Sequence, residues 1–125
     1  METLKNANAD FAGSNGTEDY YRHHLTQFIY SQGIKDIAER YQAYWLIDFI
    51  LNLNKVQKIA NEEFQIWILS RVFDDLQEKT NIFSLEMNDG NGNVIFNSRI
   101  PFSDFNADIV TMYFENSVLY LPEER

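Results

Sequence analysis

The chain has 125 residues, of which 45% are hydrophobic and 23% charged, a balance that suits one folded domain and argues against disorder. It contains no cysteine, which excludes disulfides and thiolate metal sites. The net charge of −9 comes almost wholly from residues 61–125, which carry −8 against −1 for residues 1–60. A field of that sign repels nucleic acid and anionic membranes and attracts basic surfaces.

The N-terminal region and the apolar stretches of the sequence predict the domain organisation and the cellular location of the protein. Residues 1–16 are polar and show no periodicity, so we expect a flexible tail followed by a single domain over residues 17–125. The N-terminus has no apolar signal core and no excess of arginine. The apolar stretch 43–51 contains Asp48 and is shorter than the roughly 20 residues of a membrane span. These features predict a cytoplasmic protein that does not contact a membrane.

Helical spacing is confined to the first half of the chain. Thr17 can cap a short helix that ends near His23 and His24. Residues 25–30 fit either a short strand or a packed connection. From Ile34 onward, apolar residues recur on one helix face, and the pattern continues through AYWLIDFILNL to Asn54, which predicts one long helix.

The second half of the chain predicts strands. Residues 64–69 are apolar on both faces, which is typical of a central strand. Residues 83–87 and 96–100 alternate on either side of DGNGN, which predicts a hairpin, and the runs 109–114 and 118–121 add further strands. We therefore expect an α+β fold with two to three helices packed on one face of a four- to five-stranded antiparallel sheet.

Few residues offer catalytic or metal-binding chemistry. His23 and His24 are the only histidines, and adjacent side chains diverge too far to share one metal ion easily. The DGNGN segment at residues 89–93 resembles a calcium loop, but Val94 and Ile100 stand where that loop needs glycine and glutamate. The motifs of serine hydrolases, phosphate-binding loops and zinc proteases are missing. No catalytic residue, metal or cofactor is expected.

Asp48 is the residue with the most unusual predicted environment. It lies within the apolar segment AYWLIDFIL, so we expect a buried carboxylate. A buried carboxylate must be paired, hydrogen-bonded or protonated, and Arg22, His23 or a tyrosine hydroxyl can serve as its partner. A structural anchor is the favoured interpretation. The alternative is an enzyme that uses His23, His24 and Asp48.

Acidic residues of the second half are the predicted partner-binding set. They fall mainly in turns and on the polar faces of strands, where a folded domain displays them together. A surface of this kind binds a basic protein, in a salt-sensitive manner. The candidate residues are Glu62, Glu63, Asp74, Asp75, Glu78, Glu86, Asp89, Asp104, Asp108 and Glu115.

Five segments of the sequence resemble a family of short uncharacterised domains found in bacteria, plasmids and phages. They are GTEDYYRHH, AYWLIDFI, EEFQIWIL, DGNGNVIF and the ending from IPFSDF to VLYLP, in that order, so the resemblance covers residues 16–122. Relatives often carry proline at the position of His24, and the linker at residues 74–80 is longer here. The family has no established activity, so the resemblance implies an architecture and a mobile-element setting but no site residues.

Together, charge and resemblance favour a non-enzymatic protein-binding module. The mobile-element setting suggests an inhibitor of the anti-CRISPR type, which acts on a nucleic-acid-handling protein such as an RNA-guided nuclease with its positively charged channel. The first alternative is a bacterial regulatory or adaptor protein with another partner, and the second is the histidine-dependent enzyme. A homodimer formed through a sheet edge is compatible with each of them.

Overall fold

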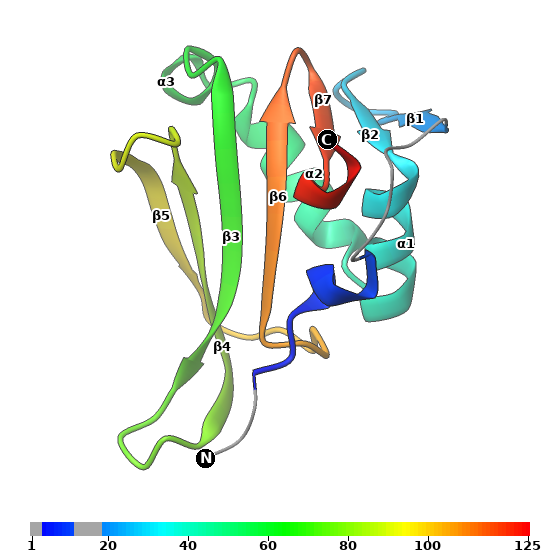
Figure 1. Cartoon of the computed structure of the whole chain (residues 1–125). Helices are drawn as coiled ribbons and strands as arrows, with labels where there is room; N and C mark the ends of the chain where they lie inside the picture. Colours follow the sequence, from blue (N-terminus) through cyan, green and yellow to red (C-terminus); the bar gives the residue numbers. More distant parts are fainter. Residues whose placement is uncertain (1–3, 12–18) are drawn as a thin grey trace.

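One mixed β-sheet of seven strands organises the computed structural model, which describes residues 4–11 and 19–125 (Figure 1). The strand order is β1-β2-β7-β6-β3-β4-β5, and every neighbouring pair is antiparallel except β2 with β7. The α+β class agrees with the prediction, but a sheet of four to five antiparallel strands is wrong. The strands are β1 (Tyr20–Arg22), β2 (Ile29–Ser31), β3 (Phe64–Phe73), β4 (Lys79–Asn88), β5 (Val94–Ile100), β6 (Ile109–Glu115) and β7 (Val118–Tyr120).

One of the two additional strands, β1, comes from a segment in which a helix was predicted, and the other, β2, begins within residues 25–30, for which a strand and a packed connection were both left open. Residues Tyr20–Arg22 form β1, so the predicted helix ending at His23 and His24 is wrong, and its cap Thr17 lies outside the described residues. Strands of three residues are too short to show alternation, whereas acids followed by histidines imitate the polarity of a helix. Strand β2 joins the sheet through parallel pairing of Ile29 with Val118, a contact that no local pattern encodes.

Strand β3 is central, as its two apolar faces predicted. It pairs with β4 on one side and β6 on the other. The hairpin of β4 and β5 around residues 89–93 also agrees with the prediction. Gln65, Trp67 and Leu69 are buried on the helix side of β3, so the alternate residues point to the opposite face of the sheet.

The predicted long helix is divided into α1 (Gln32–Tyr41) and α2 (Tyr44–Leu53), followed by the short α3 (Gln57–Ala60). The break lies at Gln42, whose φ of 54° is left-handed, and the Ala43 amide donates to the Ala38 carbonyl to close the helix end. Sequence spacing missed this break because no glycine marks it. Figure 1 shows α1 and α2 together on one face of the sheet, as predicted.

Glu124 closes the first turn of α1 from the far end of the chain. It lies in the short helix η2 (Pro122–Glu124), and its carboxylate accepts hydrogen bonds from Ser31 Oγ at 2.5 Å and the Gly33 amide at 3.1 Å. A Cβ atom on Gly33 would lie 2.7 Å from Glu124 Cδ, so a larger residue here would displace the Glu124 side chain. A negative charge here also favours the helix dipole.

Residues 4–11 are part of the folded domain, so the expected tail over residues 1–16 is wrong for this segment. Asn6 bridges to Ile109, and Asn8 exchanges two hydrogen bonds with the Thr111 backbone, at 2.6 and 2.8 Å. Its side-chain amide thus replaces a strand beside β6 where β7 has ended. Residues 7–11 form the short helix η1 (Ala7–Phe11), whereas residues 1–3 and 12–16 lie outside the described residues.

The hydrophobic core lies between the sheet and the two longer helices. Trp67, Phe83 and Leu85 from the sheet pack in the same cluster as Ile37 and Ile50 from the helices, all at most 1% exposed. Burial of large side chains at this density is the main source of stability in a domain of this size. None of the helices in the described part of the chain combines the length and apolar character of a membrane span.

Candidate functional site

The ten acidic candidates do not form one surface. Strand β3 has ten residues, and at roughly 3.3 Å per residue its ends lie about 30 Å apart. One group lies at the α3 end of the sheet, and it consists of Glu62, Glu63, Asp89 and Glu115. Another lies toward the β3–β4 hairpin, and it consists of Asp74, Asp75, Glu78 and Asp104. Glu86 lies between the groups on β4. The prediction of a shared acidic display is therefore wrong as a whole.

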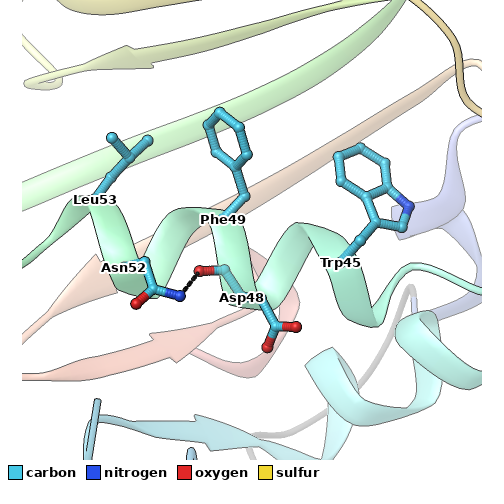
Figure 2. Close-up of a pocket in the computed structure, with 5 residues that line it drawn as sticks. All are labelled: Trp45, Asp48, Phe49, Asn52 and Leu53. Carbon is cyan, nitrogen blue, oxygen red and sulfur yellow. Dashed lines mark hydrogen bonds between the residues drawn. The ribbon is translucent and has the colours of Figure 1, made fainter. Parts of the chain in front are cut away.

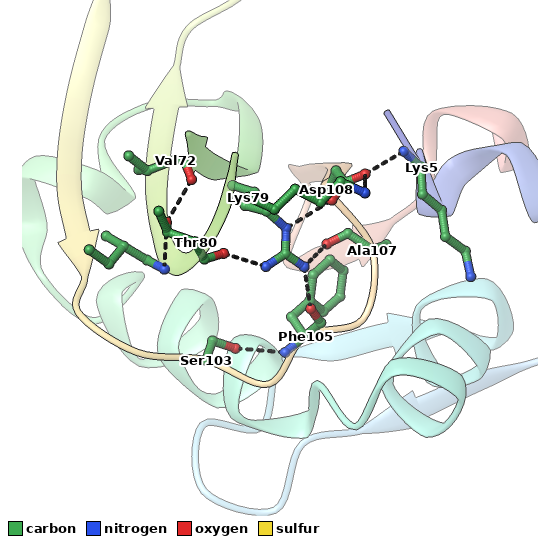
Figure 3. A network of polar contacts seen from close by, with 10 residues as sticks. Lys5, Val72, Lys79, Thr80, Ser103, Phe105, Ala107 and Asp108 are labelled. Atoms are coloured by element: carbon green, nitrogen blue, oxygen red, sulfur yellow. Dashed lines mark hydrogen bonds and ion pairs between the residues drawn. The ribbon is translucent and has the colours of Figure 1, made fainter. Parts of the chain in front are cut away.

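Asp108 is buried, at 3% exposure, and so it is not a surface residue as predicted. Its carboxylate accepts hydrogen bonds from Arg71 Nε at 2.8 Å and from the Lys5 amide at 2.6 Å, and it lies 3.0 Å from Lys79 Nζ. Lys5, Lys79 and Asp108, which Figure 3 labels, come together here from three separated parts of the chain. Among residues 4–11 and 19–125, Asp108 is the buried carboxylate, a role that sequence reasoning had assigned to Asp48.

Arg71 connects this carboxylate to the surrounding backbone. Its guanidinium donates to the carbonyls of Thr80, Phe105 and Ala107 at 2.5, 2.9 and 2.9 Å (Figure 3). Burial would raise the pKa of Asp108, but the hydrogen bond from Lys5 and the contacts with Lys79 and Arg71 outweigh it and lower the pKa. The network fixes the N-terminal segment and the β5–β6 connection against β3, which is a structural role.

Glu62, Glu63 and Glu115 come together in a groove of about 590 Å³ at the α3 end of the sheet, here called the acidic groove. Glu62 and Glu63 precede β3, whereas Glu115 ends β6 and is directly opposite Phe64 in the β3–β6 pair. Three aromatic residues, Phe28, Phe64 and Phe114, also line it. Within the described ranges, no ion pair neutralises Glu62 or Glu63.

A buried amide network holds one wall of the acidic groove in place. Gln65 is fully buried, and its Nε2 donates to Asn54 Oδ1 at 2.7 Å and to the carbonyls of Ile59 and Glu62 at 3.0 and 3.2 Å. Its Oε1 accepts from Trp67 Nε1 at 2.9 Å. Strand β3 therefore fixes the backbone that carries Glu62. Sequence reasoning missed Gln65, although a polar residue alternating with buried apolar ones was the available signal.

The β6–β7 turn forms the other wall and has a strained backbone. Asn116 and Ser117 have φ angles of 53° and 64°, as a two-residue hairpin turn of type I′ requires at both central positions. The Ser117 carbonyl accepts a hydrogen bond from the Ile29 amide at 3.1 Å, which connects this wall to β2. The turn thus places Glu115 next to the β2 side of the groove.

His23 and Asp48 are paired, but Asp48 is not buried as predicted. His23 Nε2 lies 2.7 Å from Asp48 Oδ1, and the two side chains are 4% and 50% exposed. His23 Nδ1 accepts from the Thr26 amide at 3.2 Å, so the ring proton is assigned to Nε2, which donates to Asp48. Both ring nitrogens are therefore engaged. The pair connects the β1–β2 turn to α2, whereas His24 is exposed.

An open apolar groove of about 480 Å³ lies along α2, and Asp48 is at its edge. Figure 2 shows Trp45, Phe49 and Leu53 extending from one side of the helix, with Asp48 and Asn52 on the other. Asn52 Nδ2 donates to the Asp48 carbonyl at 2.8 Å. The apolar side chains follow helical spacing, and Phe49 also contacts Phe96 of β5 at 6.3 Å between ring centroids. Trp45, Phe49 and Leu53 are partly buried and packed against the hydrophobic core, which accounts for their apolar character.

The loop at residues 89–93 is a hairpin turn. Asp89 Oδ1 accepts from the amides of Asn91 and Asn93 at 2.8 and 3.2 Å, and Gly90 and Gly92 have positive φ. The hydrogen bonds from the Asn93 side chain and the Asn91 amide lower the pKa of Asp89. Over residues 4–11 and 19–125, no three histidine or carboxylate side chains are grouped to bind a metal ion.

Comparison with known proteins adds one match. A family described as a "family of unknown function (DUF6876)" matches residues 5–125. No curated protein and no solved structure matches the chain. The matched range begins at Lys5, which agrees with the packing of the N-terminal segment against β6.

Proposed function

The chain belongs to DUF6876, a family of unknown function, and we propose that it is a protein-binding module that holds a basic segment of its partner in the acidic groove. The observation that carries the proposal is the meeting of Glu62 and Glu63 with Glu115, from separate parts of the sequence, around one aromatic-walled hollow. Carboxylates on the rim attract lysine and arginine, and aromatic walls pack against their methylene stems.

Charge and shape support a segment of protein as the ligand. Three acidic side chains in one groove focus a negative potential that accelerates association with a cationic chain. The volume of about 590 Å³ is within the range of roughly 300–1,000 Å³ that specific pockets have. The same negative potential would repel the phosphate backbone of a nucleic acid.

Among protein-binding roles, the acidic groove favours that of a regulatory or adaptor protein. An inhibitor that fills the channel of an RNA-guided nuclease was expected to use one broad acidic face. Of the other candidates, Asp89 lies in the turn after β4 at the same end of the sheet, whereas Glu86 lies on β4 and the rest lie toward the far end of the sheet or within the buried network. The groove fits a short basic segment better than it fits a wide cationic channel.

Titration of a rhodamine-labelled peptide of alternating arginine and glycine, followed by fluorescence anisotropy, tests the proposal. The groove variant is Glu62→Gln with Glu63→Gln. The matched control is Asp75→Asn with Glu78→Gln, which removes the same charge from exposed positions in the β3–β4 hairpin. We expect the groove variant to bind at least about tenfold more weakly, and the control to change by less than about twofold.

Added salt should weaken the binding of the parent protein because the contact is electrostatic and partly exposed. Equal losses in the groove variant and the control would show that net charge alone attracts the peptide. Absence of binding by the parent protein at low salt would also overturn the proposal.

A further inference from the structure

Arg125 places a guanidinium on the open face of the sheet, next to the acidic groove. Its Cζ atom lies 5.0 Å from the centre of the Phe64 ring and 5.8 Å from that of Tyr113. Its Nη2 is 3.7 Å from Glu115 Oε1. Phe64 and Tyr113 alternate with buried residues of β3 and β6, so both rings point away from the helix layer.

The side chains beneath this guanidinium come from three adjacent strands. The Phe64 and Tyr113 rings meet at 5.0 Å and 70°, and the Tyr113 and Tyr120 rings meet at 5.9 Å and 88°, both edge to face. The Tyr120 hydroxyl donates to Glu115 Oε1. Burial, and then the hydrogen bond to Glu115, raises the pKa of Tyr120, so the hydroxyl keeps its proton. We call Phe64, Tyr113, Glu115 and Tyr120 the aromatic cradle.

The cradle has the two features that a guanidinium recognises, which are aromatic faces and a carboxylate. Arg125 interacts only weakly with the aromatic rings and the carboxylate of the cradle. Its side chain is 58% exposed, and the 3.7 Å distance to Glu115 is too long for the paired hydrogen bonds that an arginine can make with a carboxylate. An ion pair this exposed holds its partners loosely. A second guanidinium with better geometry can therefore replace Arg125 at little cost.

Glu115 makes the cradle and the acidic groove one continuous surface. It lines the groove together with Glu62 and Glu63, and it also lines the adjoining hollow that includes Tyr120 and Arg125. A basic segment seated in the groove would thus bring its neighbouring residue to the cradle. Lysine has no planar group to stack on the rings, so the cradle distinguishes the two cations.

We propose that the aromatic cradle is an arginine-selective subsite of the acidic groove, which Arg125 occupies within the chain until an arginine of the partner's basic segment replaces it. This inference rests on the proposed function. Arg125 then competes with the partner, and its removal should strengthen binding of arginine peptides in particular.

The test compares Arg125→Ala with Arg99→Ala, which removes the same charge from an exposed position on β5, away from the cradle. Each protein is titrated with the rhodamine-labelled arginine peptide and with its lysine counterpart. We expect Arg125→Ala to bind the arginine peptide about three- to tenfold more tightly than the parent protein does. Arg99→Ala with either peptide, and Arg125→Ala with the lysine peptide, should change by less than about twofold.

If Arg125→Ala gains no more affinity than Arg99→Ala, or gains the same affinity for both peptides, the cradle is not an arginine-selective subsite. If binding depends on Glu62 and Glu63 but not on Arg125, the cradle fails and the proposed function stands. If neither peptide binds the parent protein or Arg125→Ala, both proposals fail.

Discussion

Replacement of Asp108 by asparagine tests the buried ionic network, because it removes the charge and preserves the shape. The carboxylate has three partners, and two of them, Arg71 and Lys79, are cations. An asparagine offers one acceptor oxygen, and its amide group would face an N–H donor. Hydrogen bonds to charged groups contribute about 1.5–3 kcal/mol each. A buried pair that loses one partner costs about 3–5 kcal/mol, so we expect a loss of about 3–4 kcal/mol, since Lys79 is one-third exposed.

Urea unfolding at neutral pH measures this loss. With a slope of roughly 2 kcal/mol per molar urea, the midpoint of Asp108→Asn should fall by about 1.5–2 M. The control is Asp104→Asn, an exposed acid in the same connection, which should stay within about 0.5 kcal/mol of the parent protein. A loss below about 1 kcal/mol in Asp108→Asn, or an equal loss in the control, would refute the structural role of the network.

The same pair of proteins has a predictable pH dependence. The folded-state pKa of Asp108 is lowered, so its stabilising contribution is complete above the unfolded pKa of about 4 and is lost as the pH falls through the folded value. The stability gap between the parent protein and Asp108→Asn should therefore narrow below about pH 4. A gap that stays constant down to acid unfolding would contradict an ionised Asp108 in the folded state.

Three further substitutions test the local packing through the free energy of unfolding. Gly33→Ala should cost about 1–3 kcal/mol, against the usual gain from alanine in a helix, because its Cβ would lie 2.7 Å from Glu124 Cδ, and a higher melting temperature would contradict this. Ser117→Gly should add about 0.5–1 kcal/mol because glycine adopts a φ of 64° without strain, and a lower urea midpoint would argue against that strain. Gln65→Leu should cost about 2–4 kcal/mol, since Trp67 Nε1 and other buried groups lose their partner, and unchanged stability in urea would show that the network contributes nothing.

Local patterns in the sequence were sufficient for the central parts of the fold. The apolar faces of residues 64–69 placed β3 in the middle of the sheet, and the glycines and asparagines of residues 89–93 placed the β4–β5 hairpin. Both features follow from residues close together in the chain, where side-chain periodicity and turn chemistry act directly. The helical character of residues 34–53 was predictable for the same reason, although the break at Gln42 was not.

The candidate site was predicted only in part. Glu62, Glu63 and Glu115 were identified as partner-binding residues, but so were Asp108, which is buried, and acids at the opposite end of the sheet. The composition shows that negative charge is concentrated in the second half of the chain, but it does not predict at which end of the sheet each acidic residue lies. The pairing of His23 with Asp48 was among the partners considered, whereas the exposure of Asp48 was not expected.

The amino-acid sequence by itself determined the fold class, the central strand and the excess of acidic charge, because each depends on composition or on spacing between near neighbours. Tertiary structure alone decided the parallel pairing of β2 with β7, the burial of Asp108 against Arg71 and the meeting of Glu115 with Glu62 and Glu63. Each of these contacts joins residues far apart along the chain. These contacts stabilise the protein only once the strands have assembled into the sheet, so no local pattern in the sequence predicts them.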